Sequence, residues 1–201
     1  GGFAPRAPRP APREALDGWC GRFGDLNEII PAEGAPFAAR VDSWSVGRFA
    51  FARTVSTPVR LVRKADHARR AGLDHWVVRV SWRGTVRSRF GDLAYVSRPG
   101  EIVVERLCQA FEDDWSADER LVLILESGSC PDIDRTLESL WPAPVPGMLA
   151  ALLADHLIAL SRRLPTIRQA EVPVAANSTQ ALIAPLSREA PFTAGPSGLI
   201  A

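Results

Sequence analysis

The chain has 201 residues and a mass of 21.8 kDa; 46% of its residues are hydrophobic and 23% are charged. A chain of this length can bury a core without disulfides or metals, so we expect one globular domain with short appendages. The formal net charge of +1 excludes a protein that seeks polyanions through its overall charge. No apolar run approaches the ~20 residues that a membrane span needs. No export signal is visible either, so we expect a cytoplasmic protein with no membrane partner.

The chain begins with residues 1–12, which alternate Ala, Pro and Arg and are expected to form a disordered leader. Residues 13–23 place apolar side chains at spacings of three and four, which predicts a short helix. The three cysteines are odd in number and have no CxxC spacing. This pattern favours a reducing compartment over a disulfide framework.

Residues 37–126 have a different sequence pattern, in which short runs rich in Val, Phe, Trp and Arg are interrupted by Gly, Pro or Asp. Such regularly interrupted runs predict a β-sandwich or barrel. The expected strands span residues 37–42, 45–54, 59–64, 75–82, 93–97, 102–107 and 120–126. The strand at 75–82 alternates most clearly. Trp76, Val78 and Val80 are expected to face the core, while Arg79 and Ser81 form a polar outer face.

The last third of the chain is expected to be helical, with helices at 132–140, 148–164 and 177–189, the last one interrupted at Pro185. The helix at 148–164 carries a broad apolar stripe. Residues 191–201 read as a linker. The expected division is therefore a leader (1–12), a barrel with its leading helix (13–145), a helical region (146–190) and a linker (191–201).

Few residues indicate catalysis. The three histidines lack metal-ligand spacing, and nucleophile or phosphate-loop motifs are absent, so we expect no metal, no cofactor and no enzymatic activity. Cys108 is expected to be a packed thiol within a strand. The acidic run 112–114 is expected to be a solvated loop rather than a paired-carboxylate site.

Charge is unevenly distributed, because segment 58–90 is basic and segment 101–138 is acidic. The basic segment would form a phosphate-contacting strip in one interpretation; in the other, which we favour, neighbouring strands pair these charges. Aromatic residues on strands suggest a ligand pocket, with arginines as anion anchors. The candidate ligand-binding residues are Trp44, Arg60, Trp76, Arg79, Trp82 and Tyr95.

Several segments, taken together in chain order, resemble those of a known protein family. Residues 74–84 read DHWVVRVSWRG, residues 97–104 read SRPGEIVV, and residues 110–112 read AFE; helices at 148–164 and 177–189 follow. Over residues 19–190 this order is similar to the N-terminal sensor domain of AraC-type bacterial transcription regulators. Glu101 departs from the family's pattern, which usually has Asp there.

The resemblance implies an α+β fold, a cupin-like β-barrel or jelly roll followed by C-terminal helices. It also implies a small-molecule effector, a homodimer, and DNA binding only through a C-terminal helix-turn-helix domain that these 201 residues do not include. The helix at 148–164 would pair with its copy, although part of its stripe should pack on its own barrel. The candidate interface residues are Leu149, Leu152, Leu153, His156 and Leu160.

Other functions remain open on the sequence alone. One is a free-standing cupin-like protein that binds a small molecule, or a metal-independent enzyme of that fold. A metal-dependent cupin enzyme, a barrel that binds only a protein partner, and direct nucleic-acid binding by the basic segment are further alternatives.

Overall fold

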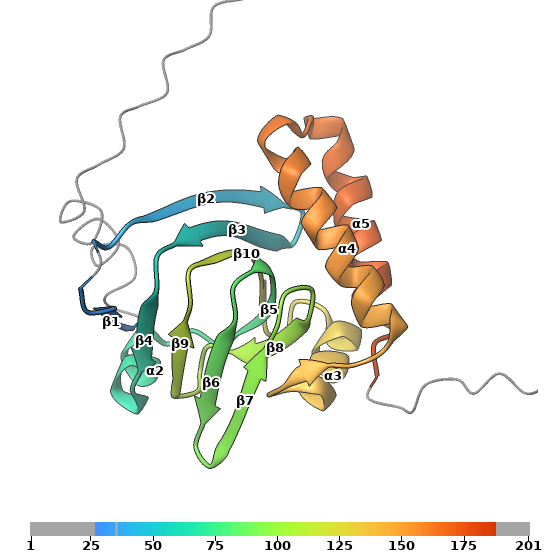
Figure 1. The fold of residues 1–201 in the computed structure, drawn as a ribbon. Coiled ribbons are helices and arrows are strands. Elements are labelled where there is room, and N and C mark those ends of the chain that lie inside the picture. The colour runs from blue at the N-terminus through green and yellow to red at the C-terminus, as the bar shows by residue number, and fades with distance from the viewer. Residues whose placement is uncertain (1–26, 35, 188–201) are drawn as a thin grey trace, which may run out of the picture.

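The structure, a computed structural model, describes residues 27–34 and 36–187 and contains two antiparallel sheets and a group of helices (Figure 1). The predicted leader, the leading helix at 13–23 and the linker at 191–201 lie outside the described residues. The predicted order, strands first and helices last, is confirmed within them.

The smaller sheet has five strands in the order β1-β4-β9-β6-β7. Its strands are β1 (Glu28–Pro31), β4 (Val59–Arg63), β9 (Phe111–Trp115), β6 (Val86–Phe90) and β7 (Leu93–Ser97). The larger sheet has six strands in the order β11-β8-β5-β10-β3-β2. Its strands are β11 (Pro144–Val145), β8 (Ile102–Arg106), β5 (His75–Arg83), β10 (Asp118–Glu126), β3 (Phe49–Ser56) and β2 (Ala39–Val46).

The helices are α2 (Ala65–Ala71), α3 (Pro131–Leu140), α4 (Met148–Arg163) and α5 (Val172–Ile183). In Figure 1, α3, α4 and α5 lie on the same side of the molecule, while α2 lies beside β4. Two 3-10 turns, Leu164–Thr166 and Gln169–Glu171, join α4 to α5. The helix α5 ends at Ile183, before Pro185, because a proline cannot continue the hydrogen-bond ladder.

The main hydrophobic core lies between the six-stranded sheet and these helices. Alternate residues of the central strands, among them Val78, Val80, Leu121 and Leu123, form one cluster with buried residues of α3, α4 and α5. A second, smaller cluster of Phe37, Val59 and Leu61 lies at the β4 end of the five-stranded sheet. The helices α4 and α5 therefore share one hydrophobic core with the six-stranded sheet. The predicted boundary at residue 145 runs through this core.

The orientation predicted for β5 was wrong. Its apolar residues do face a core, but that core is on the helix side of the sheet. Arg79 and Ser81 were expected to face solvent, yet they are only 2% and 4% exposed. They point toward the five-stranded sheet, because a strand between two buried layers has no solvent-facing side. The polar alternate residues of β5 thus line the space between the two sheets.

Other differences concern segments with little apolar character. The strands β1, β6, β9 and β11 and the helix α2 were not predicted. The residues 112–114 belong to strand β9 rather than to a solvated loop. Cys108 lies in the turn after β8, not in a strand. The two strands expected at 37–42 and 45–54 form a hairpin, β2 and β3, whose turn lies at Gly47 with φ +61°.

Truncation of Leu157 tests the packing of α4 on the sheet. Its side chain is fully buried in the core, so Leu157→Ala should lower the free energy of unfolding by about 2–5 kcal/mol. Leu152 on the same helix is 46% exposed, and Leu152→Ala should cost only on the order of 0.5 kcal/mol. Urea unfolding of both variants measures the difference, and equal losses would contradict the orientation of α4.

Candidate functional site

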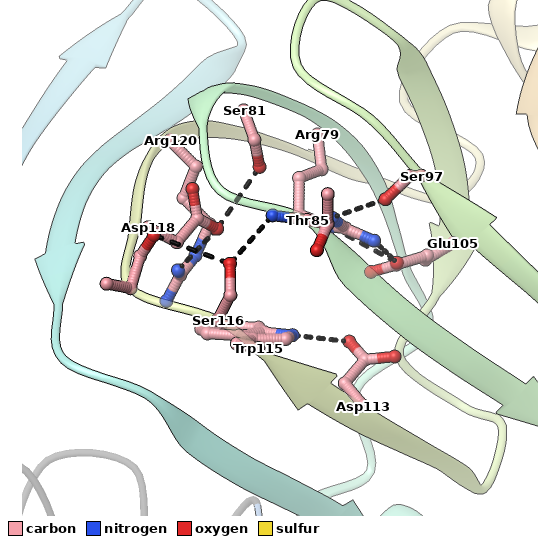
Figure 2. Close-up of polar contacts among 11 residues, drawn as sticks. Arg79, Ser81, Thr85, Ser97, Glu105, Asp113, Trp115, Ser116, Asp118 and Arg120 are labelled. Carbon is pink, nitrogen blue, oxygen red and sulfur yellow. Dashed lines mark hydrogen bonds and ion pairs between the residues drawn. The ribbon is translucent and has the colours of Figure 1, made fainter.

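The space between the two sheets holds a group of buried polar side chains, drawn in Figure 2. They come from strands of both sheets and are named here the inter-sheet cluster. Its members are Arg79 and Ser81 on β5, Ser97 on β7, Glu105 on β8, Asp113 and Trp115 on β9, and Asp118 and Arg120 on β10. Strand alternation explains why these side chains lie on the same side of the sheet: Arg120 and Ser81, for example, are direct cross-strand partners and therefore share a face.

Arg79 connects the two sheets at one end of the cluster. Its Nη2 and Nε donate to Oε1 of Glu105 at 2.7 and 3.3 Å, and its Nη1 donates to Ser97 Oγ at 3.3 Å. Both side chains of the ion pair are almost fully buried. Burial alone would lower the pKa of Arg79, but Glu105 and then Asp113 outweigh it, so the pKa lies above the ordinary value. Arg79 is therefore a charged and fully partnered link between sheets.

Arg120 lies at the other end of the cluster and is only partly partnered. Its Nη1 donates to Asp118 Oδ2 at 2.9 Å, and Ser81 Oγ donates to the same oxygen at 3.1 Å. The guanidinium carbon of Arg120 lies 3.2 Å from the ring centroid of Trp115. The atoms Nε and Nη2 of Arg120 and Oδ1 of Asp118 are buried and have no hydrogen-bond partner. Burial lowers the pKa of Arg120 to about 10, which still leaves it charged at neutral pH.

Asp113 is a buried carboxylic acid of the cluster whose pKa is raised toward neutral pH. Trp115 Nε1 donates to Asp113 Oδ2 at 3.1 Å, and the residue is only 1% exposed. Burial, and then the neighbouring charge of Glu105, raises the pKa of Asp113 to about 6. The site can therefore take up or release a proton near neutral pH.

Two of the six predicted ligand residues, Arg79 and Tyr95, face the space between the sheets. Tyr95 stacks on Phe90, with ring centroids 6.1 Å apart. Burial, and then the charge of Glu105, raises the pKa of Tyr95.

The other four predicted ligand residues lie elsewhere. Trp76 faces α3 and donates from Nε1 to Asp134 Oδ1 at 2.8 Å. Trp44 and Trp82 pack against the helix-side core. Arg60 lies on the outer face of the five-stranded sheet and pairs with Glu112 at 2.7 Å. The three tryptophans face the helices and not the space between the sheets, because the apolar alternate residues of each strand pack in the core on the helix side.

The sequence reasoning missed most of the cluster. Asp113 was placed in a solvated acidic loop, whereas alternation along β9 puts it inside and puts Glu112 and Asp114 outside. The alternation of Phe111, Asp113 and Trp115 was the available signal. Asp118 and Arg120 stand before an apolar run, and no sequence pattern marks them as buried.

The predicted pairing of basic and acidic segments is confirmed. Arg60 bridges Glu112 on the neighbouring strand, Arg83 bridges Glu119, and Arg79 bridges Glu105 inside the barrel. An open groove of about 350 Å³ on the five-stranded sheet is lined by residues that include Arg87 and Arg89, and it brings together two of the six predicted ligand residues, Arg60 and Tyr95.

The predicted interface residues of α4 divide into two groups. Leu153 and Leu160, both named as interface candidates, are buried in the chain's own core. Leu149 is half-buried, and His156 Nε2 lies 2.9 Å from Thr179 Oγ1 of α5. Only Leu152 is exposed, next to Met148, which is 74% exposed. Any surface for a partner on this helix is therefore narrower than the predicted stripe.

Within residues 27–34 and 36–187, no group of three or more His, Cys, Asp or Glu side chains is arranged to hold a metal ion. In the same part of the chain, no helix combines the length and apolar character needed to cross a membrane.

No protein-family model matches the chain, and no curated protein matches it by sequence. Its fold is similar to that of a solved AraC-like transcriptional activator, CuxR. The TM-score is 0.78 at 19% sequence identity, over 90% of this chain and 69% of that chain.

Two further structures match less well. They are an RmlC-like cupin protein from Desulfovibrio desulfuricans (TM-score 0.34, 15% identity, 44% of this chain and 81% of that one) and the Clostridium difficile EutQ protein (0.36, 9%, 49% and 70%). The predicted α+β class, a jelly-roll-like pair of antiparallel sheets followed by C-terminal helices, is confirmed by the order and pairing of the elements.

Replacement of Asp113 tests the electrostatics of the cluster. Its pKa is raised from 3.8 to about 6 in the folded chain. The folded state therefore binds this proton more tightly, and the resulting stability is full below about pH 4 and lost as the pH rises to about 6. We expect Asp113→Asn to remove this loss, gaining on the order of 1–3 kcal/mol relative to the native chain between about pH 4 and pH 7.

Urea unfolding across this pH range measures the effect. The matched control is Asp114→Asn, which changes the neighbouring carboxylate on the exposed outer face. If the two variants have the same pH profile, Asp113 is not buried as described.

Proposed function

We propose that this chain is the effector-sensing and dimerisation domain of a bacterial transcription regulator of the AraC type. The effector, a small molecule, binds between the two sheets, and the chain acts in the cytoplasm as a homodimer. DNA is contacted by a separate C-terminal helix-turn-helix domain. A ligand that prefers one arrangement of barrel and helices shifts the population of DNA-competent dimers.

The observation that carries this proposal is the buried polar lining between the sheets. Charged groups buried away from water are costly unless they are paired, and nearly all buried polar groups have partners in native proteins. Arg120 and Asp118 keep unpartnered atoms there. A few polar groups that converge in this way are typical of the groups that orient a small molecule in its site. The likeness to the AraC-like activator, in fold alone, is consistent with a regulatory role.

Helix α4 is the proposed dimer element, because Met148 and Leu152 expose apolar surface at its N-terminal end. We expect sedimentation velocity to give a mass of about 44 kDa, twice that of the 21.8 kDa chain. Introducing Met148→Glu and Leu152→Glu together should produce a monomer, because a C2 contact would oppose the new charges directly.

Val174→Glu is the matched control, since Val174 is also exposed and apolar but lies on α5. It should leave the dimer unchanged. A native chain that is monomeric at every concentration, or a dimer lost equally in the control, would contradict this interface.

Effector binding has its own test, a thermal-unfolding screen with defined sugars, organic acids, amino acids and nucleotides. We expect at least one compound to raise the midpoint by several degrees, since a ligand at 100 times its Kd adds about 2.7 kcal/mol. The absence of any stabilising compound would favour a barrel that binds only a protein partner.

A further inference from the structure

The guanidinium of Arg120 is held on two sides and has no hydrogen-bond partner on a third. Asp118 holds Nη1, and the ring of Trp115 covers one face of the group. The remaining edge, formed by Nε and Nη2, is buried and has no partner. A guanidinium fixed in this way loses little conformational entropy when a group binds to its free edge.

The same edge holds a carboxylate at other arginines of this chain. Four of them donate from both Nε and Nη2 to one carboxylate: Arg79 with Glu105, Arg106 with Asp74, Arg40 with Asp42, and Arg168 with Glu171. At Arg106 the two bonds measure 2.7 and 2.9 Å and reach different oxygens of Asp74. This two-point geometry matches the oxygens of a carboxylate or a phosphate. In Arg120 the same edge lacks that partner.

Unpartnered acceptors occur on the same strand as Arg120 and on the strand paired with it. Asp118 Oδ1 and Ser56 Oγ are both buried without a hydrogen bond. The two residues are direct partners across β10 and β3, and Arg120 faces Thr54 two residues along the same register. A buried acceptor without a donor destabilises the folded state. A donor placed next to the anionic group would satisfy Asp118 Oδ1.

We propose that Arg120 binds the anionic group of the effector, a carboxylate or a phosphate, through Nε and Nη2, and that Asp118 accepts a hydrogen bond from a hydroxyl or ammonium group next to it. The proposal rests on the function proposed above, because it names the chemistry of the ligand of the same site. The ligand is thus a small anion with an adjacent donor, such as a hydroxy acid, an amino acid or a polyol phosphate.

Calorimetry with simple probes tests the proposal at constant ionic strength. Acetate and glycolate differ only by the hydroxyl group; methyl phosphate and glycerol phosphate form the second pair, compared at about pH 8, where both phosphate groups are dianions without a proton of their own. We expect glycolate or glycerol phosphate to bind at least about tenfold more tightly than its partner without the donor. The pair that binds more tightly identifies the anionic group as a carboxylate or a phosphate.

Variants of Arg120 test whether the anionic probes bind at this residue. Arg120→Lys keeps the charge but loses the two-point edge, and it should weaken binding about tenfold or more. Arg120→Gln should abolish binding. Arg40→Gln is the control, since Arg40 is exposed and already holds Asp42 on the outside of the barrel. General stabilisation by salts would persist in Arg120→Gln and is thereby distinguished from binding at this site.

The outcomes separate this proposal from the proposed function. If no anionic probe binds but a neutral sugar or nucleoside stabilises the protein, the role of Arg120 is wrong while effector sensing stands. If anions bind equally well to Arg120→Lys, or neither glycolate nor glycerol phosphate binds better than its partner without the donor, the proposal is also overturned. If nothing binds in either experiment, both proposals fail.

Discussion

The burial of charge between the two sheets is the constraint on which the rest of the structure depends. Arg79, Glu105, Asp113, Asp118 and Arg120 all lie there, and none is more than 6% exposed. Removing such groups from water costs several kcal/mol per ion unless counter-charges and hydrogen bonds are correctly placed. The contacts of Arg79 with Ser97 and of Arg120 with Trp115 therefore join the six-stranded sheet to the five-stranded one. Polar contacts, together with the small apolar cluster at one end, set the spacing of the sheets.

This arrangement is stable because the hydrophobic core is on the other side of the larger sheet. Leu121 and Leu123 pack with the buried residues of α3, α4 and α5, while Arg120 next to them in the chain points the opposite way. The apolar burial that stabilises the fold thus leaves the inner face available for polar groups. It also places the proposed ligand site and the proposed dimer helix on opposite faces of one strand, β10. In our proposal, a shift of this strand on ligand binding would reach α4 through direct packing.

The sequence predicted the class of fold and the positions of the long elements, because these depend on strong local signals. Apolar periodicity and a following proline located the helix at 148–163, and turn residues located β5 and β7. The face of each strand was harder to predict. A strand between a helical layer and a polar interior alternates as a half-exposed strand does, so Arg79 and Ser81 looked solvent-facing. Asp113 was missed for the same reason, since its exposed neighbours Glu112 and Asp114 resemble it in sequence and differ only in the direction they point.

The most direct test of the account is a crystal structure of the protein grown in glycolate, at a resolution that shows ordered water. The account predicts density between the two sheets that bridges Nε and Nη2 of Arg120 and reaches Oδ1 of Asp118. A structure in which these two nitrogens donate to a carboxylate of the protein itself, with nothing bound between the sheets, would contradict it.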